Sequence, residues 1–375
     1  MTGRIPHIRA EGSPREVGRA HGGRMKSLVE SNRELYFRRF REEWGLSRDD
    51  VLDRAGKYER VIRDLAPEYA EAMEGLAEAS GIPLPDVVAL NVRYELVYSE
   101  YSRQGRARAA TRLPSGCTGV ALLPDRTEAG HLLMAQNWDW ISGVRGLVVH
   151  QRLEEGPEVL GFTEAGIVGA KIGLNAAGLG LMINGLVSDQ DAWDRLGAPF
   201  HVRCWDVLRK ARLEDAVRLL RETPSSCSAN FLLAQVQGNS GHVADVEVSP
   251  VGSNLLEPSE GFFTHANHFH RPEALGISEP LLSERPSTHR RESRLADLAR
   301  DALVARRVLP SDVQDMLRDH DGHPNSICRH PDPGLPLSEQ YETIASIVMD
   351  LTERSLWISQ GSPCTSEYTR FGFDS

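Results

Sequence analysis

The stretch RLPSGCTGVALL, residues 112–123, marks a change of pattern in the chain. Before Gly116 the sequence is polar and rich in arginine, and after Cys117 an apolar run with the composition of a buried strand begins. A cysteine at such a junction has two interpretations. It is either a small buried hydrophobic residue or a nucleophile placed at the end of a flexible segment.

The chain before this junction is predicted to be helical. Apolar side chains recur at helical spacing over residues 14–43 and again over residues 84–101. A third helix is expected over residues 67–80, which begin with a proline suited to a first helical turn and stop before a glycine. Residues 102–116 are polar and are interpreted as a flexible linker. Everything before Cys117 is therefore expected to form one helical segment, residues 1–116.

From Cys117 to residue 375 the pattern changes to alternation with a period of two. Apolar runs are separated by short turn-like segments, which is typical of hairpins. Helical patterns interrupt the alternation over residues 200–222 and 286–306. Many hairpins with a few long helices predict an α+β fold with layered antiparallel sheets. Strands are expected at 118–124, 131–140, 146–153, 158–166, 171–175, 178–185, 230–238 and 241–249, and a further hairpin at 345–361.

Composition argues against several classes of protein. The formal net charge is −10, so no positive field favours nucleic acid or anionic lipid, and neither partner is expected. The sequence has neither an apolar run of about 18 residues nor a signal-peptide core, so a cytoplasmic protein without membrane contact is expected. The five cysteines are odd in number and form no CxxC pair, which argues against a disulfide scaffold or a zinc ribbon.

The bond between Gly116 and Cys117 is suited to self-cleavage. Attack of the Cys117 thiol on the Gly116 carbonyl would move the acyl group from nitrogen to sulfur, and hydrolysis of that thioester would cut the chain. Glycine favours the step because the missing Cβ leaves the carbonyl open and the backbone free to adopt strained conformations. The product carries a thiol and an α-amine whose ordinary pKa is about 7.7–8.0. Such an amine is a suitable general base for its own thiol.

Several short motifs follow Cys117 along the chain: QNWDW at 136–140, TEAGIVG at 163–169, GLNAAG at 173–178, HANH at 265–268 and SICR at 326–329. Together with GCT at 116–118, this ordered set resembles the penicillin acyltransferase (isopenicillin N acyltransferase) family of autoproteolytic N-terminal-nucleophile cysteine enzymes. The resemblance covers nearly the whole chain. It implies a four-layer αββα sandwich with antiparallel sheets over residues 117–375, preceded by a helical pro-segment.

The resemblance also implies which residues do the chemistry. Cys117 would be the nucleophile both of self-cleavage, between Gly116 and Cys117, and of catalysis. Asp139 would support the Cys117 amine, since a carboxylate holds an ammonium in place and tunes its pKa. Asn267 would donate an amide N–H to the oxyanion, although both it and Asp139 also fit structural roles at turns. Substrate contacts are expected from Thr118, Trp138, Glu164, Asn184 and His265.

The implied activity is that of an amidohydrolase or N-acyltransferase. Cys117 would take an acyl group from a small N-acyl or peptide-like amide, or from a thioester, and pass it to water or an amine. No cofactor is expected other than acyl-CoA as an optional co-substrate. After cleavage, residues 1–116 (the α-chain) are expected to stay bound to residues 117–375 (the β-chain). Two alternatives remain open: a long-chain N-acyl amide hydrolase of the choloylglycine or ceramidase type, and a non-catalytic protein that keeps the fold. An insertion near residues 125–130 and a loosely matching segment at 360–371 leave the substrate undetermined.

A metal site is not expected. His265, His268 and His270 are close in sequence, but alternation along the preceding strand would place His265 and His268 on opposite faces. Neither a carboxylate nor a thiol lies near them in the sequence, and zinc sites need a set of such ligands. The other four cysteines are interpreted as structural: Cys204, Cys227, Cys328 and Cys364.

Overall fold

The computed structural model describes residues 5–107, 116–238, 240–280, 282–284, 286–305, 307–336 and 340–374. The strands form an eight-stranded sheet with the order β1-β4-β5-β6-β7-β8-β9-β10 and a six-stranded sheet with the order β11-β2-β3-β12-β13-β14. Neighbouring strands pair antiparallel, whereas β1 runs parallel to β4.

The strands expected from the alternation of apolar residues are confirmed. The larger sheet contains β1 (His7–Gly12), β4 (Gly146–Leu153), β5 (Val159–Glu164), β6 (Ile172–Asn175), β7 (Leu179–Gly185), β8 (Ala229–Gln237), β9 (Ser240–Ser249) and β10 (Gly252–Leu256). The smaller sheet contains β2 (Thr118–Leu122), β3 (Leu133–Ile141), β11 (Phe262–His265), β12 (Tyr341–Asp350), β13 (Ser355–Gln360) and β14 (Thr369–Gly372). The predicted hairpins β2–β3 and β12–β13 are confirmed.

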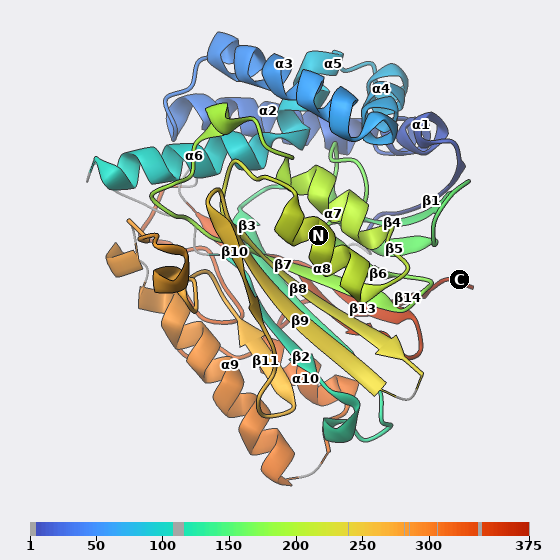
Figure 1. The fold of residues 1–375 in the computed structure, drawn as a ribbon, viewed down its shortest axis with the longest axis vertical. Helices are drawn as coiled ribbons and strands as arrows, with labels where there is room; N and C mark the ends of the chain where they lie inside the picture. The colour runs from blue at the N-terminus through green and yellow to red at the C-terminus, as the bar shows by residue number, and fades with distance from the viewer. Residues whose placement is uncertain are drawn as a thin grey trace.

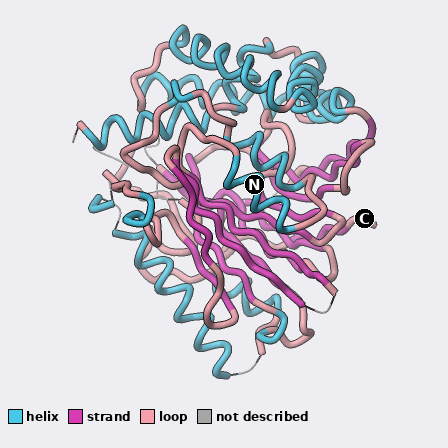
Figure 2. The backbone as a smooth tube through the Cα atoms, in the orientation of Figure 1, coloured by secondary structure: helices cyan, strands magenta, loops and turns pink. Residues whose placement is uncertain are grey.

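Helices cover the outer face of each sheet (Figures 1 and 2). Helices α7 (Phe200–Leu208) and α8 (Leu213–Glu222) pack on the larger sheet, and α9 (Pro286–Ala305) and α10 (Pro310–Leu317) on the smaller one. The inner faces meet through apolar side chains, where a Cβ on Gly180 of β7 would lie 2.7 Å from the Met134 sulfur of β3. The predicted α+β fold with αββα layers is therefore confirmed.

The N-terminal segment is mostly helical, as predicted. The expected helix at 67–80 is confirmed, but the expected helices at 14–43 and 84–101 are each two helices, because the backbone leaves the helical conformation at Met25 and Val92. Helix α3 is an addition to the predicted set. The bounds are α1 Pro14–Arg24, α2 Lys26–Glu42, α3 Arg48–Leu65, α4 Pro67–Ser80, α5 Leu84–Asn91 and α6 Arg93–Arg106.

The predicted linker begins too early in the sequence. Helix α6 continues to Arg106, and the Ser102 hydroxyl donates a hydrogen bond to the Ser188 carbonyl at 2.6 Å. Residues 108–115 of that predicted linker lie outside the described residues. Gly116 and Cys117, which follow them, are described.

The N-terminal segment is an integral part of the fold formed by the rest of the chain. Strand β1 extends the larger sheet beside β4, in the register His7 to Val148. The Asn32 side chain of α2 donates to the carbonyls of Arg145 and Ala165 at 2.8 and 2.9 Å. Figure 1 shows α1–α6 stacked across one end of the sheets. The segment therefore shares a core with the rest of the chain.

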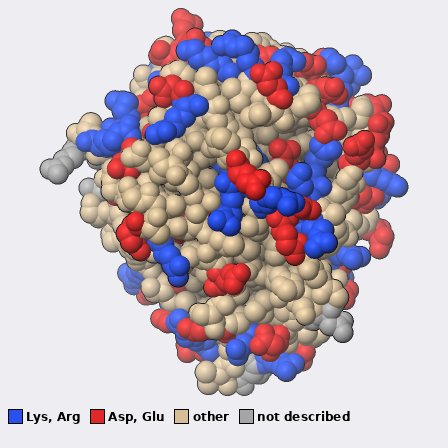
Figure 3. Space-filling model, in the orientation of Figure 1, with Lys and Arg blue, Asp and Glu red and all other residues tan. Residues whose placement is uncertain are grey.

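The surface charges are mixed in sign. Figure 3 shows lysine and arginine interspersed with aspartate and glutamate over the face in view. Among the helices of the described residues, we find none with the length and apolar character that crossing a membrane requires.

Candidate active site

Cys117 lies immediately before β2 and is 4% exposed. Pairing of Thr118 with Asn137 places it beside the part of β3 that carries Asp139. The Cys117 carbonyl accepts hydrogen bonds from the Arg291 guanidinium at 2.9 Å and from the Asn184 amide at 3.1 Å. The backbone around the candidate nucleophile is therefore fixed by buried side chains from two other elements.

The Cys117 thiol is held in its protonated form. Burial raises its pKa to about 12, and the nearby Asp139 carboxylate adds to the rise. A hydrogen bond from the Asp139 backbone N–H and the positive charges of Lys171 and Arg291 act in the opposite direction. Because a thiolate is the effective nucleophile, the site needs a base beside the sulfur.

Asp139 is fully buried in β3 and has the properties of such a base. One carboxylate oxygen accepts a hydrogen bond from the Thr343 hydroxyl at 2.7 Å. The other is buried and has no hydrogen-bond partner among the described residues. Burial raises the pKa of Asp139 to about 7, against the charges of Arg291 and Arg329, so the carboxyl exchanges protons near neutrality.

Asn267 lies against Gly116, the residue whose bond to Cys117 is predicted to be cut. A Cβ on Gly116 would lie 2.8 Å from the Asn267 Nδ2 atom. Arg291 donates to the Asn267 Oδ1 atom at 3.0 Å, and Nδ2 donates to the Gly185 carbonyl at 3.1 Å. Because a guanidinium only donates hydrogen bonds, the amide atom that Arg291 contacts is the oxygen, and the other end is the NH₂ donor. The donor end of this amide therefore lies on the Gly116 side.

Among the predicted substrate contacts, Thr118 and Asn184 lie at the Cys117 main chain. Arg291 donates to the Thr118 hydroxyl, and Asn184 binds the Cys117 carbonyl. Both side chains are buried. This placement fits a role in positioning the nucleophile, and their contact with a substrate stays a prediction.

Trp138 and Glu164 are connected through a residue that the sequence analysis did not single out, Lys171. The Lys171 ammonium lies 3.2 Å from the centroid of the Trp138 ring and forms a buried ion pair with Glu164. Glu164 also pairs with Arg93 of α6 and accepts a hydrogen bond from the Tyr36 hydroxyl of α2. Glu164 thus joins the N-terminal helices to the wall of the site, and its contact with substrate stays a prediction.

Replacing Arg93 by alanine is expected to destabilise the protein by about 3 kcal/mol or more, because it leaves the buried Glu164 without one of its partners. Chemical denaturation of the purified chain measures the change. Arg9→Ala is the control: it removes an exposed ion pair with Glu11 and should cost no more than about 1 kcal/mol. Equal effects for the two variants would contradict the structural role of the Glu164 pair.

His265 has protein partners on both ring nitrogens. Nδ1 lies 2.8 Å from the Ala266 carbonyl oxygen, and Nε2 lies 3.2 Å from a Glu247 carboxylate oxygen. Burial disfavours its charge, but Asp245 and Glu247 together raise its pKa to about 10. Its own carbonyl accepts from Asn184 at 3.5 Å. The arrangement favours support of Asn184, and direct contact with substrate stays a prediction.

Carboxylates lie beside these histidines, contrary to the expectation from the sequence. The fold brings carboxylates to them from distant positions: Glu247 contacts His265, and Glu292 of α9 contacts His268 and His270. Sequence proximity could not show this, because β9 and α9 approach the segment only in the folded chain.

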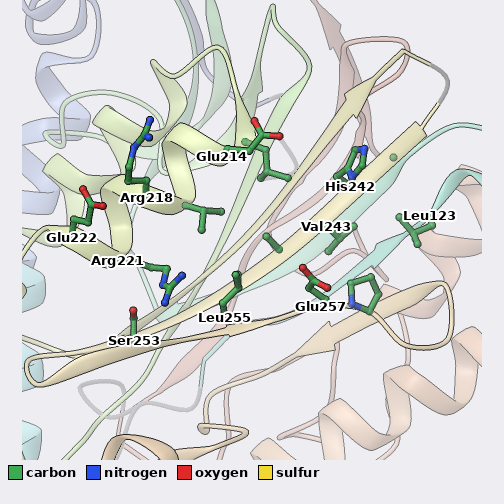
Figure 4. Close-up of a pocket in the computed structure, with 15 residues that line it drawn as sticks. Leu123, Glu214, Arg218, Arg221, Glu222, His242, Val243, Ser253, Leu255 and Glu257 are labelled. Atoms are coloured by element: carbon green, nitrogen blue, oxygen red, sulfur yellow. The ribbon is translucent and has the colours of Figure 1, made fainter.

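The cavity drawn in Figure 4 is not the candidate active site. It has a volume of about 770 Å³ and lies between α8 and the strands β9 and β10, with Arg218, Glu222 and His242 among its lining residues. A second cavity of about 770 Å³ is lined by Thr343 and Phe162. Thr343 binds Asp139, and the Phe162 ring lies 5.3 Å from that of Trp138. On chemical grounds, this second cavity is the better candidate for a substrate pocket.

Two further groups in the site could not be recognised from the sequence. Arg291 contacts Cys117, Thr118 and Asn267 at once. It lies in an arginine-rich helix, where nothing distinguishes it from its solvated neighbours. Thr343 has no motif around it, and its position opposite Asp139 follows from the pairing of β12 with β3.

Comparison with known proteins gives the family. The model of the family described as acyl-coenzyme A:6-aminopenicillanic acid acyl-transferase matches residues 126–365, well over half of the chain. The acyl-coenzyme A:6-aminopenicillanic-acid-acyltransferase 40 kDa form of Emericella nidulans is 23% identical over 370 residues, covering 97% of this chain and 94% of the relative.

Two solved structures are also similar. An N-acylethanolamine-hydrolyzing acid amidase ortholog from Caenorhabditis elegans has 14% identity and a TM-score of 0.43, covering 63% of this chain and 93% of that one. A mutant of the conjugated bile acid hydrolase from Clostridium perfringens has 12% identity and a TM-score of 0.41, covering 68% of this chain and 96% of that one. On the match of the family model, the chain belongs to the acyl-coenzyme A:6-aminopenicillanic acid acyl-transferase family and is an enzyme of the acyltransferase class.

Proposed function

We propose that this enzyme activates itself by cutting the Gly116–Cys117 bond and then uses the Cys117 thiol to transfer acyl groups from small amides or thioesters. One observation carries the proposal: buried polar groups contact the main chain on both sides of that bond. Arg291 and Asn184 hold the Cys117 carbonyl, and the Asn267 amide lies against Gly116. A structural cysteine needs no such surroundings.

Self-cleavage proceeds in two steps, formation of a thioester and its hydrolysis. The Cys117 sulfur bonds to the Gly116 carbonyl carbon while the carbon–nitrogen bond breaks, and the thiol proton passes through Asp139 to the leaving nitrogen. Water then adds to the thioester, which gives the Gly116 carboxyl group and returns a proton to the sulfur. The Asn267 amide, whose donor end lies on the Gly116 side, stabilises the oxyanion in both steps, a role worth about 3–4 kcal/mol for one donor.

Cleavage would supply a charged group that can bind the Asp139 carboxylate. The new α-amine of Cys117 is created beside the Asp139 carboxylate, one of whose oxygens is buried without a hydrogen bond among the described residues. An ammonium there is stabilised by the carboxylate, and the amine serves as the base for the thiol in each later turnover.

Turnover repeats the same chemistry on an external carbonyl. The Cys117 sulfur takes the acyl group while the leaving amine or thiol receives the proton, and water or an amine then accepts the acyl group. The second cavity has the volume of a small-molecule site, and Arg145, Glu342 and Glu367 give it charge of both signs. We therefore place a small N-acyl or peptide-like amide there, with acyl-CoA as an optional thioester donor and no other cofactor in the acyl-transfer reaction.

The cleaved α-chain, residues 1–116, stays with the β-chain in this proposal. Strand β1 pairs with β4, and Arg93 of α6 is buried against Glu164, so separation would expose a sheet edge and an unpaired charge. The five free thiols fit a reducing compartment, and we propose the cytoplasm.

Electrophoresis and gel filtration of the purified wild type test this function. Denaturing gels are expected to show two bands, for residues 1–116 and 117–375, and native gel filtration one peak that contains both. The sample is then assayed with short- and long-chain N-acyl amides and thioesters. An uncut chain that turns over these substrates would overturn self-activation. A cut chain would favour a non-catalytic protein if it showed no turnover sensitive to thiol alkylation.

Gly116→Ala is expected to slow cleavage at least about tenfold, because the added Cβ would lie 2.8 Å from an Asn267 amide that is already held by Arg291 and Gly185. Time courses of newly synthesised chains on denaturing gels measure the rate. Gly56→Ala is the matched control, since a Cβ there meets nothing within 4 Å. Cleavage of Gly116→Ala at the wild-type rate would contradict the placement of Asn267 at the scissile bond.

A further inference from the structure

Four side chains with metal-binding chemistry converge between the segment that follows α10 and the turn after β13. His320, Cys328 and His330 lie in the segment that follows α10, and Cys364 lies in the turn after β13. One donor atom from each lies within 4.8 Å of all the others. The two Nε2 atoms are 3.1 Å apart, and the His330 Nε2 atom lies 3.4 Å from the Cys364 sulfur and 3.6 Å from the Cys328 sulfur.

These separations match the requirements of one ion. Zinc bound to two sulfurs and two imidazole nitrogens at its usual bond lengths keeps its ligand atoms about 3.3–3.8 Å apart in a tetrahedron. The three observed contacts lie close to this range, and the remaining pairs of donor atoms lie within 4.8 Å. Two thiols and two imidazoles are also the ligand set that zinc prefers over magnesium or calcium.

We propose that His320, Cys328, His330 and Cys364 form a structural zinc site. Binding displaces one proton from each thiol, so that two thiolates and two neutral imidazoles hold the ion. Cys328 is buried, His330 is half-buried, and His320 and Cys364 are exposed, so the site opens to solvent on one side for the ion to enter. With four protein ligands the coordination is complete, which is typical of a structural and not a catalytic zinc.

The main chain around the ligands is already fixed by the protein. The Cys328 backbone N–H donates to the Asp319 carbonyl at 2.9 Å, and the Ser326 hydroxyl donates to the Cys328 carbonyl at 2.6 Å. Arg318 donates to the Pro363 carbonyl at 3.0 Å, which ties the turn that carries Cys364 to the end of α10. The donors are therefore held together before an ion binds, which reduces the entropy cost of binding.

The proposed ion would also stabilise the active site at a distance. Arg329 lies between the two ligands Cys328 and His330, and its backbone N–H donates to the Thr343 hydroxyl oxygen at 2.9 Å. The same hydroxyl donates to Asp139 at 2.7 Å. Zinc thus holds the segment that sets the orientation of Thr343, and through it that of Asp139.

Metal analysis of the full-length chain tests the proposal. Wild type loaded with zinc and dialysed against metal-free buffer should retain about one ion per chain, and so should Cys117→Ala, whose nucleophile is absent. Cys364→Ser and His320→Gln change exposed side chains, so they should fold, and each should retain less than about a tenth as much. His242→Gln, at another exposed histidine, is the matched control and should retain the wild-type amount.

Two further measurements, the absorption spectrum with cobalt and the melting temperature, also test the proposal. Cobalt in place of zinc should give a thiolate charge-transfer band in wild type that Cys364→Ser lacks, and a chelator should lower the melting temperature of wild type but not of Cys364→Ser. Wild type without retained zinc, or variants that retain as much as wild type, would overturn the proposal. A Cys328–Cys364 disulfide in non-reducing peptide maps would overturn it as well.

Discussion

Cys117→Ala is expected to remain a single uncut chain and to lose turnover by at least about 10⁴-fold. Both losses follow from one atom, because the same sulfur is the nucleophile in cleavage and in acyl transfer. The side chain is small and the site around it is held by Arg291, Asn184 and Asn267, so the variant should fold. Denaturing gels report cleavage, and release of the amine or thiol product reports turnover.

The control for this variant is Cys204→Ala. Cys204 is also a buried thiol whose pKa burial raises, but it lies in α7 and not beside β2. The Cys204→Ala variant should cleave itself and turn over substrate at the wild-type rates. If Cys117→Ala were cut at the same bond, another group would have to be the nucleophile of cleavage, and the assignment of Cys117 would fail.

Asp139→Asn is expected to slow cleavage by about 10²–10⁴-fold and to remove its pH dependence below neutrality. In wild type the carboxyl must lose its proton before it can accept one from the thiol. Because burial raises its pKa to about 7, the rate should fall about tenfold for each pH unit below 7 and level off above it. Rates measured on newly synthesised chains from pH 5 to 9 give the profile.

Two variants make this assignment specific. Thr343→Val removes the hydrogen bond that stabilises the Asp139 carboxylate, so the midpoint of the profile should move to higher pH. Asp206→Asn is the control, since the pKa of Asp206 in α7 is also raised by burial, to about 6, and its loss should leave the profile unchanged. A wild-type profile for Asp139→Asn would show that a different group accepts the proton.

The layers of the fold could be predicted because they depend on local patterns. Alternation located β4 and the β2–β3 hairpin, and a proline and a glycine located the ends of α4. Strand β1 could not be predicted in the same way. It is short, and it joins the sheet as a parallel strand beside β4, a pairing between residues more than a hundred positions apart. Its place depends on the fold of the rest of the chain.

The candidate site was predicted only where a motif marks it. Cys117, Asp139 and Asn267 stand in recognisable segments, and the structure brings them together. Arg291 and Lys171 carry no such mark. A buried cation is defined by its partners, and these partners come from elements that the sequence keeps apart. The same holds for Cys328 and Cys364, whose 36-residue separation hides their proximity.

Mass spectrometry of the intact wild-type protein, before and after incubation with an acyl thioester, tests the central claim most directly. Self-activation followed by acyl transfer predicts two masses, those of residues 1–116 and 117–375. The larger fragment alone should gain the mass of the acyl group, at Cys117, and lose it when hydroxylamine is added. A single mass for the uncut chain, or an acyl group on any other residue, would contradict the claim.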